Sequence, residues 1–505
     1  MNQLMDMNIQ EKQQKMTAAF WCLLAAAFID FLIIVLGPFM DFYLDEWLLI
    51  PSCLYLFAVY RQEKTKTAQK VLLLGGIMCT WYVITQLLHH CMGLQTRPLG
   101  MVLSVYLLAL PFAAVLRDDR RGLKLYMGVF LAAMVVVLIL AGLATIDWVP
   151  RFIRHKVYFW WSGLIVMIHP SQLACFLLVG IGFALVVLSF TKKLIKKITL
   201  FVMAGLLSIT LVMTKCQTAM WIMYLLYSAY CFFAISRGGL IRFLAGVVAA
   251  VMVFGCSYSA SQAIFQWYTE ESWARPQQFS YVNLWDDSAI ATGMYDQLHD
   301  DSEKDMTNVG WIFPVRSAKA EDVAEAVQVQ RFSLRNTLDK LLPSLNGRKG
   351  IWLEIYDVMK KDPQTILFGT DYTNSYILEH TGKDFAHSHN SWIEALIALG
   401  LPGLFIVALM TAIAFWHIFI ILFGKQYELW QKSVALLEIC LLAVGAMEPH
   451  LFLGGHYLAE RNSLHPSDFT FFLCLGYMIQ WRATDKASRK KRQQEVTQEI
   501  VPAKE

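Results

Sequence analysis

The sequence predicts an all-α integral membrane protein with about twelve transmembrane helices and a large extracytoplasmic loop that carries amphipathic helices. Of its 505 residues, 57% are hydrophobic and only 16% are charged, whereas a soluble chain usually carries about a quarter charged residues. The apolar residues also come in blocks of roughly 18 to 25, which is the length needed to cross a bilayer. Short basic links recur after every second block. The composition therefore excludes a water-soluble globular chain.

Each apolar block is expected to be a helix, because backbone groups in lipid must be hydrogen-bonded within the segment. The alternating pattern of an outer-membrane barrel is absent from the sequence. The block at 162–190 is longer than one crossing and contains Pro170, so we expect a tilt, a break or a re-entrant start there. We place the spans at 17–36, 45–60, 71–89, 99–116, 123–146, 162–190, 197–214, 218–235, 240–260, 391–423, 432–448 and 466–482.

The basic links predict the orientation of the chain in the membrane. They lie at 61–70, 117–124, 191–197 and 236–242, and the basic stretch 482–492 falls on the same side. The positive-inside rule makes these links cytoplasmic and places both termini in the cytoplasm. The first span then acts as an uncleaved anchor. The net charge is only +4, and we expect no nucleic-acid partner.

The spans divide the chain into four parts. Residues 1–260 form an N-terminal transmembrane bundle of about nine spans, and 261–389 form the extracytoplasmic loop. A C-terminal bundle of about three spans follows at 390–482, and 483–505 is a basic cytoplasmic tail. None of the ten cysteines lies between residues 257 and 390, which excludes a disulfide framework or a zinc ribbon in the loop.

The extracytoplasmic loop has an irregular first part and a periodic second part. Residues 267–320 are acidic and lack periodicity, which favours a solvated surface over a calcium site. Residues 321–342 carry an apolar stripe at helical spacing. A second stripe ends before Pro363 and consists of Ile351, Ile355, Val358 and Met359. We therefore expect two amphipathic helices that lie over the bundle.

The motif NGRKGIW at 346–352 is the first candidate for chemistry. It places Arg348 and Lys349 in the first turn of the second loop helix. A helix N-terminus attracts anions, and a guanidinium adds a fork that fits a phosphate or pyrophosphate. Two solvated basic residues are the equally weighted alternative.

The motif HSHNSWIEALIALGLPG at 387–403 is the second candidate. It places His387, His389 and Asn390 at the membrane surface. A histidine there can take a proton from a sugar hydroxyl near neutral pH. A structural interfacial histidine and a metal site are the alternatives, but the partners that zinc usually has are not nearby. We predict no metal and no other cofactor.

Further candidates are polar residues at the outer ends of spans. Lys215 and Gln217, in TKCQTA, interrupt the seventh and eighth spans, and polar groups at such depth mark a site or a lining. A tight polar turn with a snorkelling Lys215 is the alternative. Arg154 precedes the sixth span and Glu448 ends the eleventh. Headgroup anchoring for Arg154 and a structural salt bridge for Glu448 are their alternatives.

These clusters, in this order, resemble the bacterial O-antigen ligase and O-antigen polymerase superfamily. GLIVMIHPSQLA at 163–174 is similar to the family's Gly–aromatic–x–His/Asn–Pro–Asn stretch, with Ser171 in place of the Asn. TKCQTA at 214–219 is similar to its Thr–x–Ser–Arg stretch. The family's third motif consists of Gly–Arg, a Trp, an amphipathic helix, a Pro and a Gly. It is matched by residues 346–370, NGRKGIWLEIYDVMKKDPQTILFGT. HNSWIEALIALGLPG at 389–403 resembles its last motif, which has a downstream Gly–x–x–Gly.

The resemblance implies a bundle of about twelve spans that transfers a glycan from undecaprenyl diphosphate to an acceptor hydroxyl, without metal. Carried over, Arg348 grips the donor pyrophosphate and His389 activates the acceptor. The family's Arg is Gln217 here and its Ser is Cys216. The donor phosphate is then held differently, for example by Lys215, or the activity is altered. The further substrate-binding candidates are Lys215, Gln217, Asn390, Glu448 and Arg154.

The expected function is that of a metal-independent, inverting glycosyltransferase in cell-surface polysaccharide assembly, with a polymerase ranked slightly ahead of a ligase. Its expected place is the bacterial plasma membrane, with the active site on the extracytoplasmic face. Its expected partners are the undecaprenyl-diphosphate-linked donor, a glycan or lipid-glycan acceptor, membrane lipid and polysaccharide assembly proteins. A transporter or flippase for a lipid-linked glycan and a catalytically silent scaffold are the alternatives.

Overall fold

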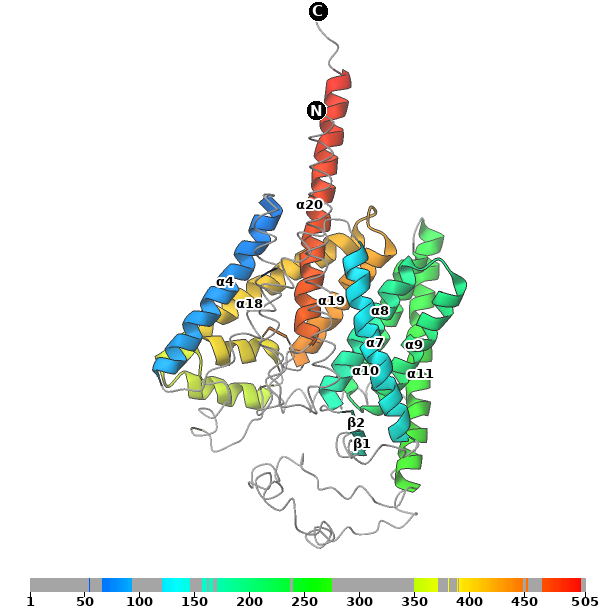
Figure 1. Cartoon of the computed structure of the whole chain (residues 1–505), viewed down its shortest axis with the longest axis horizontal. Coiled ribbons are helices and arrows are strands. Elements are labelled where there is room, and N and C mark those ends of the chain that lie inside the picture. The colour runs from blue at the N-terminus through cyan, green and yellow to red at the C-terminus, as the bar shows by residue number, and fades with distance from the viewer. Residues whose placement is uncertain are drawn as a thin grey trace, which may run out of the picture.

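The chain folds mainly into long helices that lie side by side (Figure 1). In the described residues, seven helices are long and apolar enough to cross a membrane. The protein is therefore a multi-pass helical membrane protein, as the composition predicts. The computed structural model describes residues 54, 66–92, 120–145, 157–160, 163–166, 170–236, 239–274, 349–370, 380, 388, 390–447, 451–452 and 466–500.

The predicted spans that fall in this part of the chain are helical. Helices α7 to α11, α18 and α19 include the seven apolar segments, and α4 and α20 form where spans at 71–89 and 466–482 are predicted. The spans predicted at 17–36 and 99–116, and all but one residue of 45–60, lie outside the described residues. The total of about twelve spans stays a prediction. The helices are α4 (Lys66–Cys91), α7 (Arg120–Thr145), α8 (Pro170–Phe190), α9 (Leu194–Met213), α10 (Gln217–Ile235), α11 (Leu240–Ala274), α16 (Pro363–Phe368), α18 (Ser391–Phe423), α19 (Leu429–Met447) and α20 (Pro466–Ile500).

A small antiparallel hairpin corrects the prediction for 162–190. Strand β1 (Val157–Trp160) pairs with β2 (Gly163–Val166), and α8 begins only at Pro170. Proline suits the first turn of a helix and disfavours helical backbone in the residue before it, which sets this boundary. The β-branched and aromatic residues ahead of it favour strands. The helical start at 162 is wrong, because α8 begins only at Pro170, whereas the other regular elements described are all helices, as the all-α prediction requires.

Two helices extend further than their predicted spans. Helix α11 continues beyond residue 260 to Ala274, and α20 continues beyond residue 482 to Ile500. The added part of α20 contains Ala, Lys, Arg, Gln and Glu, which favour helix, and it contains neither Gly nor Pro. The predicted tail is thus largely a continuation of the last helix. Figure 1 shows its end standing well beyond the other helices.

Helix α8 lies at the centre of the main hydrophobic core. It packs against α7, α9 and α19, and its apolar side chains between Leu173 and Val186 are almost all buried. At Gly182 a Cβ atom would lie 2.5 Å from Leu437 Cδ1, so the missing side chain lets α19 approach closely. Small residues at such contacts are typical of helix packing in membranes.

Helices α9 and α11 show the opposite pattern, because they expose large apolar side chains. Phe201 on α9 is 72% exposed and Ile241 on α11 is 84% exposed. Large apolar side chains exposed on helices in this way are unfavourable in water and match the hydrocarbon of a bilayer. This surface is independent support for a membrane protein.

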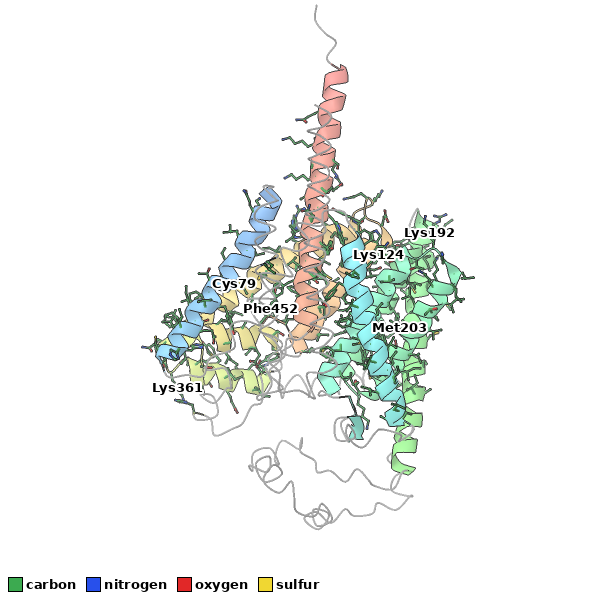
Figure 2. All side chains as sticks on the ribbon, in the orientation of Figure 1. Cys79, Lys124, Lys192, Met203, Lys361 and Phe452 are labelled. Carbon is green, nitrogen blue, oxygen red and sulfur yellow. The ribbon has the colours of Figure 1, made fainter. Side chains whose placement is uncertain are left out.

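The bundle has two chemically different ends. One, here called the basic end, carries Lys124 near the start of α7 and Lys192 between α8 and α9 (Figure 2). The opposite end, here called the site end, carries the turn 214–216 between α9 and α10, the start of α18 and the end of α19. Lys361 also lies at the site end (Figure 2). The positive-inside rule predicts that the basic end is cytoplasmic.

Candidate functional site

The start of α18 is fixed to the end of α19 by Asn390. Its Oδ1 accepts hydrogen bonds from the backbone N–H groups of Trp392 (2.9 Å) and Ile393 (3.1 Å), which caps the helix. Its Nδ2 donates to the carbonyl of Ala446 at 3.0 Å. Both polar atoms of this predicted substrate ligand thus have structural partners. A direct contact between Asn390 and substrate stays a prediction.

The residue just before His389 is held over the first turn of α18 by a buried glutamate. Glu394 is 1% exposed, and its Oε1 accepts a hydrogen bond of 2.6 Å from the backbone N–H of Ser388. The Ser388 hydroxyl donates to the carbonyl of Asn390 at 2.9 Å. A carboxylate also suits the positive end of the helix dipole. Residues 388 and 390 on both sides of His389 are therefore fixed.

One hydrogen bond joins the two predicted motifs directly. The Trp352 Nε1–H donates to the carbonyl of Ser388 at 2.7 Å. Trp352 lies one helical turn after Arg348, in a helix described over 349–359, and Ser388 immediately precedes His389. The segments that carry the predicted anion-binding guanidinium and the predicted base are thus neighbours, although their motifs lie far apart in the sequence.

Apolar contacts support the same pairing. The predicted stripe of the loop helix packs on the first turns of α18, against Ile393, Leu396 and Ile397. Ile355 and Met359 are 2% and 1% exposed. Residues 349–359 are helical where the second amphipathic helix is predicted, whereas the first, at 321–342, lies outside the described residues. The stripe residues in contact are Ile351, Ile355, Val358 and Met359.

The loop helix ends before Pro363, as predicted, and a short helix follows. Asp362 caps α16, because its carboxylate accepts from the backbone N–H of Gln364 at 2.9 Å and proline occupies the first turn. Helix α16 then returns the chain to α18. This return was not predicted, since proline was expected only to stop the preceding helix.

Two motif glycines meet where α16 crosses α18. Gly369 and Gly400 have φ angles of +81° and +68°, which disfavour other residues. A Cβ at Gly369 would collide with the carbonyl of Ile397, and one at Gly400 would collide with the carbonyl of Leu367. Gly400 also kinks α18. The end of the 346–370 motif and Gly400 of the 389–403 motif are thus parts of one backbone contact.

Helix α4 fastens this crossing to the rest of the bundle. Trp81 Nε1–H donates to the carbonyl of Leu399 at 3.0 Å, and His89 Nε2 lies 2.8 Å from the carbonyl of Phe368. His89 is 1% exposed. Neither residue is among the predicted site residues. The available signal was a tryptophan and a histidine within the span predicted at 71–89.

Lys215 occupies a strained and partly buried position in the turn between α9 and α10. Its φ is +57°, in the left-handed region, which costs a non-glycine residue about 1 to 2 kcal/mol. Burial lowers the pKa of its amine. Strain of this kind and a perturbed pKa are both enriched at functional sites. Left-handed backbone directly after a helix C-cap is also a common way to end a helix, so a role of Lys215 in the site stays a prediction.

The other predicted site residues are located only through their neighbours. Gln217 begins α10, but its side chain lies outside the described part of the molecule. Glu448 directly follows the last residue of α19. The site end contains Lys215 and Asn390. It also contains the described residues that are next in sequence to Arg348, His389 and Glu448. The predicted residues outside the described part are Arg154, Arg348, His389 and Glu448.

Comparison with models of known protein families and with curated proteins finds no match for this chain. The resemblance to the O-antigen ligase and polymerase superfamily therefore depends on the four motifs in the sequence. Three of them can now be related in space. The third and fourth are joined through Trp352, Ser388, Gly369 and Gly400, and the second lies at the same end of the bundle.

Proposed function

We propose that the protein is a membrane glycosyltransferase that moves an undecaprenyl-diphosphate-linked glycan onto an acceptor hydroxyl in cell-surface polysaccharide assembly. The observation that supports this most is the hydrogen bond between Trp352 and Ser388, because it brings together the segments that carry Arg348 and His389. In this proposal the chain crosses the bacterial plasma membrane about twelve times and has cytoplasmic termini. The site end is then extracytoplasmic.

In the proposed reaction, an acceptor oxygen attacks the anomeric carbon from the face opposite the diphosphate. A new carbon–oxygen bond forms as the bond to the diphosphate oxygen breaks, and the lipid diphosphate leaves with that electron pair. The acceptor proton passes to His389, which can bind it near neutral pH. The anomeric configuration is inverted. No metal or cofactor enters the proposal.

Arg348 meets the charge that grows on the leaving group. The sequence predicts that it lies in the first turn of the loop helix, where backbone N–H groups lack helical partners and the dipole favours an anion. A guanidinium can bind two phosphate oxygens at once. The loop helix that follows Arg348 packs on α18, which follows His389, and in the proposal this packing preorganises the two groups for transfer.

Lys215 supplies a second positive charge in place of the family arginine. Its amine loses its proton more easily than a solvated lysine because it is partly buried, and a bound diphosphate would restore the charge. Gln217, Glu448 and Arg154 complete the proposed substrate contacts. Asn390 acts as a positioning residue, since it directly follows His389 and its amide donates a hydrogen bond to the end of α19.

A polymerase is slightly favoured over a ligase, because a ligase needs a particular acceptor lipid that nothing in the chain indicates. A transporter for lipid-linked glycan is the second candidate. The observation that favours it is Glu438, a buried acid midway along α19, since intramembrane acids often belong to proton pathways.

Reconstitution of the purified protein in vesicles distinguishes the two candidates. The vesicles contain a lipid-diphosphate-linked glycan, and acceptor glycan is supplied on the extracytoplasmic side. The transferase proposal expects a new glycosidic product that depends on the protein, without movement of donor between leaflets. Movement of donor between leaflets with no product would contradict it and favour the transporter.

A further inference from the structure

Glu438 is the strongest unexplained group in the described part of the molecule. Its side chain is 0% exposed, and neither of its carboxylate oxygens has a hydrogen-bond partner among the described residues. It lies in the middle of the apolar segment Leu429–Met447. With a rise of about 1.5 Å per residue, it is roughly 13 Å from either end of the helix. Neither end of the bundle therefore solvates it.

Among the described residues, no positively charged group interacts with Glu438. Helix α19 packs against α8, α10, α18 and α20. On α20, Cys474 is close enough for an electrostatic interaction with the carboxylate, and the hydroxyl of Thr470, one turn earlier, is buried without a partner. No charged group on the described parts of α8, α10 or α18 interacts with it. Lys432, on the same helix, holds its ammonium 5.2 Å from the ring centre of Phe233.

This environment selects the neutral form of the side chain. An ionised carboxylate with no partner costs far more to bury than a neutral carboxylic acid. The bilayer around the bundle raises that cost, because it replaces water with hydrocarbon. A packed helix also has no free backbone N–H groups in its middle, so the backbone cannot stabilise the charge.

We propose that Glu438 is an intramembrane proton-binding site, occupied at neutral pH, at the contact between α19 and α20. Release of the proton leaves a bare carboxylate against Cys474 and weakens the packing of α20, the helix that continues into the basic C-terminal stretch. The proton site lies midway between the two ends, away from the motifs at the site end. Its tests measure labelling and melting temperature, so its failure can be told apart from a failure of glycosyl transfer.

A hydrophobic carbodiimide tests this in the full-length protein in membranes. A protonated carboxylic acid adds its O–H across a C=N bond of the reagent, and the adduct rearranges to a stable N-acylurea that mass spectrometry locates. Labelling of Glu438 is expected at neutral pH. The rate should fall about tenfold per pH unit once the acid begins to lose its proton. Glu428, an exposed glutamate just before the same helix, is the internal control and should stay unlabelled.

The variant Glu438→Gln provides a second readout. The folded wild-type protein retains a proton that the unfolded chain releases, so its melting temperature should fall as the pH rises from neutral to alkaline. The amide cannot titrate, so Glu438→Gln should lose that part of the pH dependence, whereas Glu428→Gln should keep it. Absence of labelling at Glu438 at neutral pH, or coincident pH profiles for wild type and Glu438→Gln, would overturn the proposal.

Discussion

Two buried glutamates show how the same residue type serves two regions of this molecule. Glu394, in the first turn of α18, is 1% exposed and accepts a hydrogen bond from the N–H of Ser388 at 2.6 Å. Glu438, in the middle of α19, is 0% exposed and has no hydrogen-bond partner in the described structure. Free backbone N–H groups exist at helix ends and not in helix centres. Burial alone therefore does not indicate the role of an acidic side chain, whereas its hydrogen-bond partners do.

The surroundings of the two glutamates differ in the same way. Around Glu394 the chain is held by particular contacts, namely the Trp352–Ser388 hydrogen bond and the crossing of Gly369 with Gly400. Around Glu438 the helices are held by apolar packing, as at Gly182 and Leu437. Single substitutions should therefore act strongly at the site end, and near Glu438 mainly through charge.

The largest effect is expected from Gly400→Ala, which breaks the site-end contacts. The new methyl group would meet the carbonyl of Leu367, and the φ of +68° is unfavourable for alanine. We expect a loss of about 4 kcal/mol or more in the free energy of unfolding, measured by denaturation in detergent. The matched control is Gly205→Ala, because a Cβ there meets nothing within 4 Å. Similar losses in both variants would contradict the crossing.

The paired variants Glu394→Gln and Glu438→Gln test the comparison itself. At Glu394 an amide replaces the acid that accepts the Ser388 hydrogen bond, so the free energy of unfolding should fall by about 1 kcal/mol. At Glu438 the amide removes the cost of holding a proton that the unfolded chain releases at neutral pH, so the free energy of unfolding should rise. Thermal unfolding of both proteins at neutral pH provides the measurement. An inverted order would refute the assignment of partners.

Trp352→Phe sharpens the comparison by removing one hydrogen bond and keeping an aromatic ring. The carbonyl of Ser388 loses its indole donor, which should lower stability by about 1 kcal/mol. Because the segment before His389 is then less constrained, the rate of glycan transfer should fall by more than the loss of folded protein explains. Steady-state transfer rates measure this, with Tyr356→Phe, an exposed ring on the same helix, as control. Equal rates for both variants would remove Trp352 as a positioning residue.

The smallest stability effect is expected at Lys215. Lys215→Gly relieves the left-handed strain, so the protein should become more stable by up to about 1 kcal/mol while donor binding weakens. Burial lowers the pKa of the Lys215 amine, so rising pH should remove its charge and weaken donor binding in the wild type. Lys215→Arg stays charged and should keep donor binding to higher pH. Donor affinity measured across pH would refute this role if the two profiles coincided.

The sequence predicts the features of this fold that depend on periodicity. Apolar blocks gave the positions of α7 to α11, α18 and α19, and the spacing of Ile351, Ile355, Val358 and Met359 identified the amphipathic helix. The hairpin was missed, because four-residue apolar strands cannot be told from the start of an apolar helix by pattern alone. The ends of α11 and α20 were missed because a helix does not have to stop at the membrane surface.

The site was only partly predictable, for a different reason. Motif order suggested that Arg348 and His389 work together, but nothing local in the sequence indicates that Trp352 bonds to Ser388 or that Gly369 meets Gly400. Such contacts are long-range, and they are fixed by the packing of the loop on α18. Glu438 was also missed, although a single acid in the apolar stretch at 433–447 was a visible signal.

Glycan transfer by His389→Ala tests the central claim most directly. The measurement is the formation of glycosidic product by purified protein from a lipid-diphosphate-linked donor and an acceptor glycan. His380→Ala, in an exposed histidine of the same loop, is the matched control. Thermal unfolding of both variants shows whether the fold is retained. The account predicts that His389→Ala folds and forms no product while His380→Ala remains active; full activity of His389→Ala would contradict it.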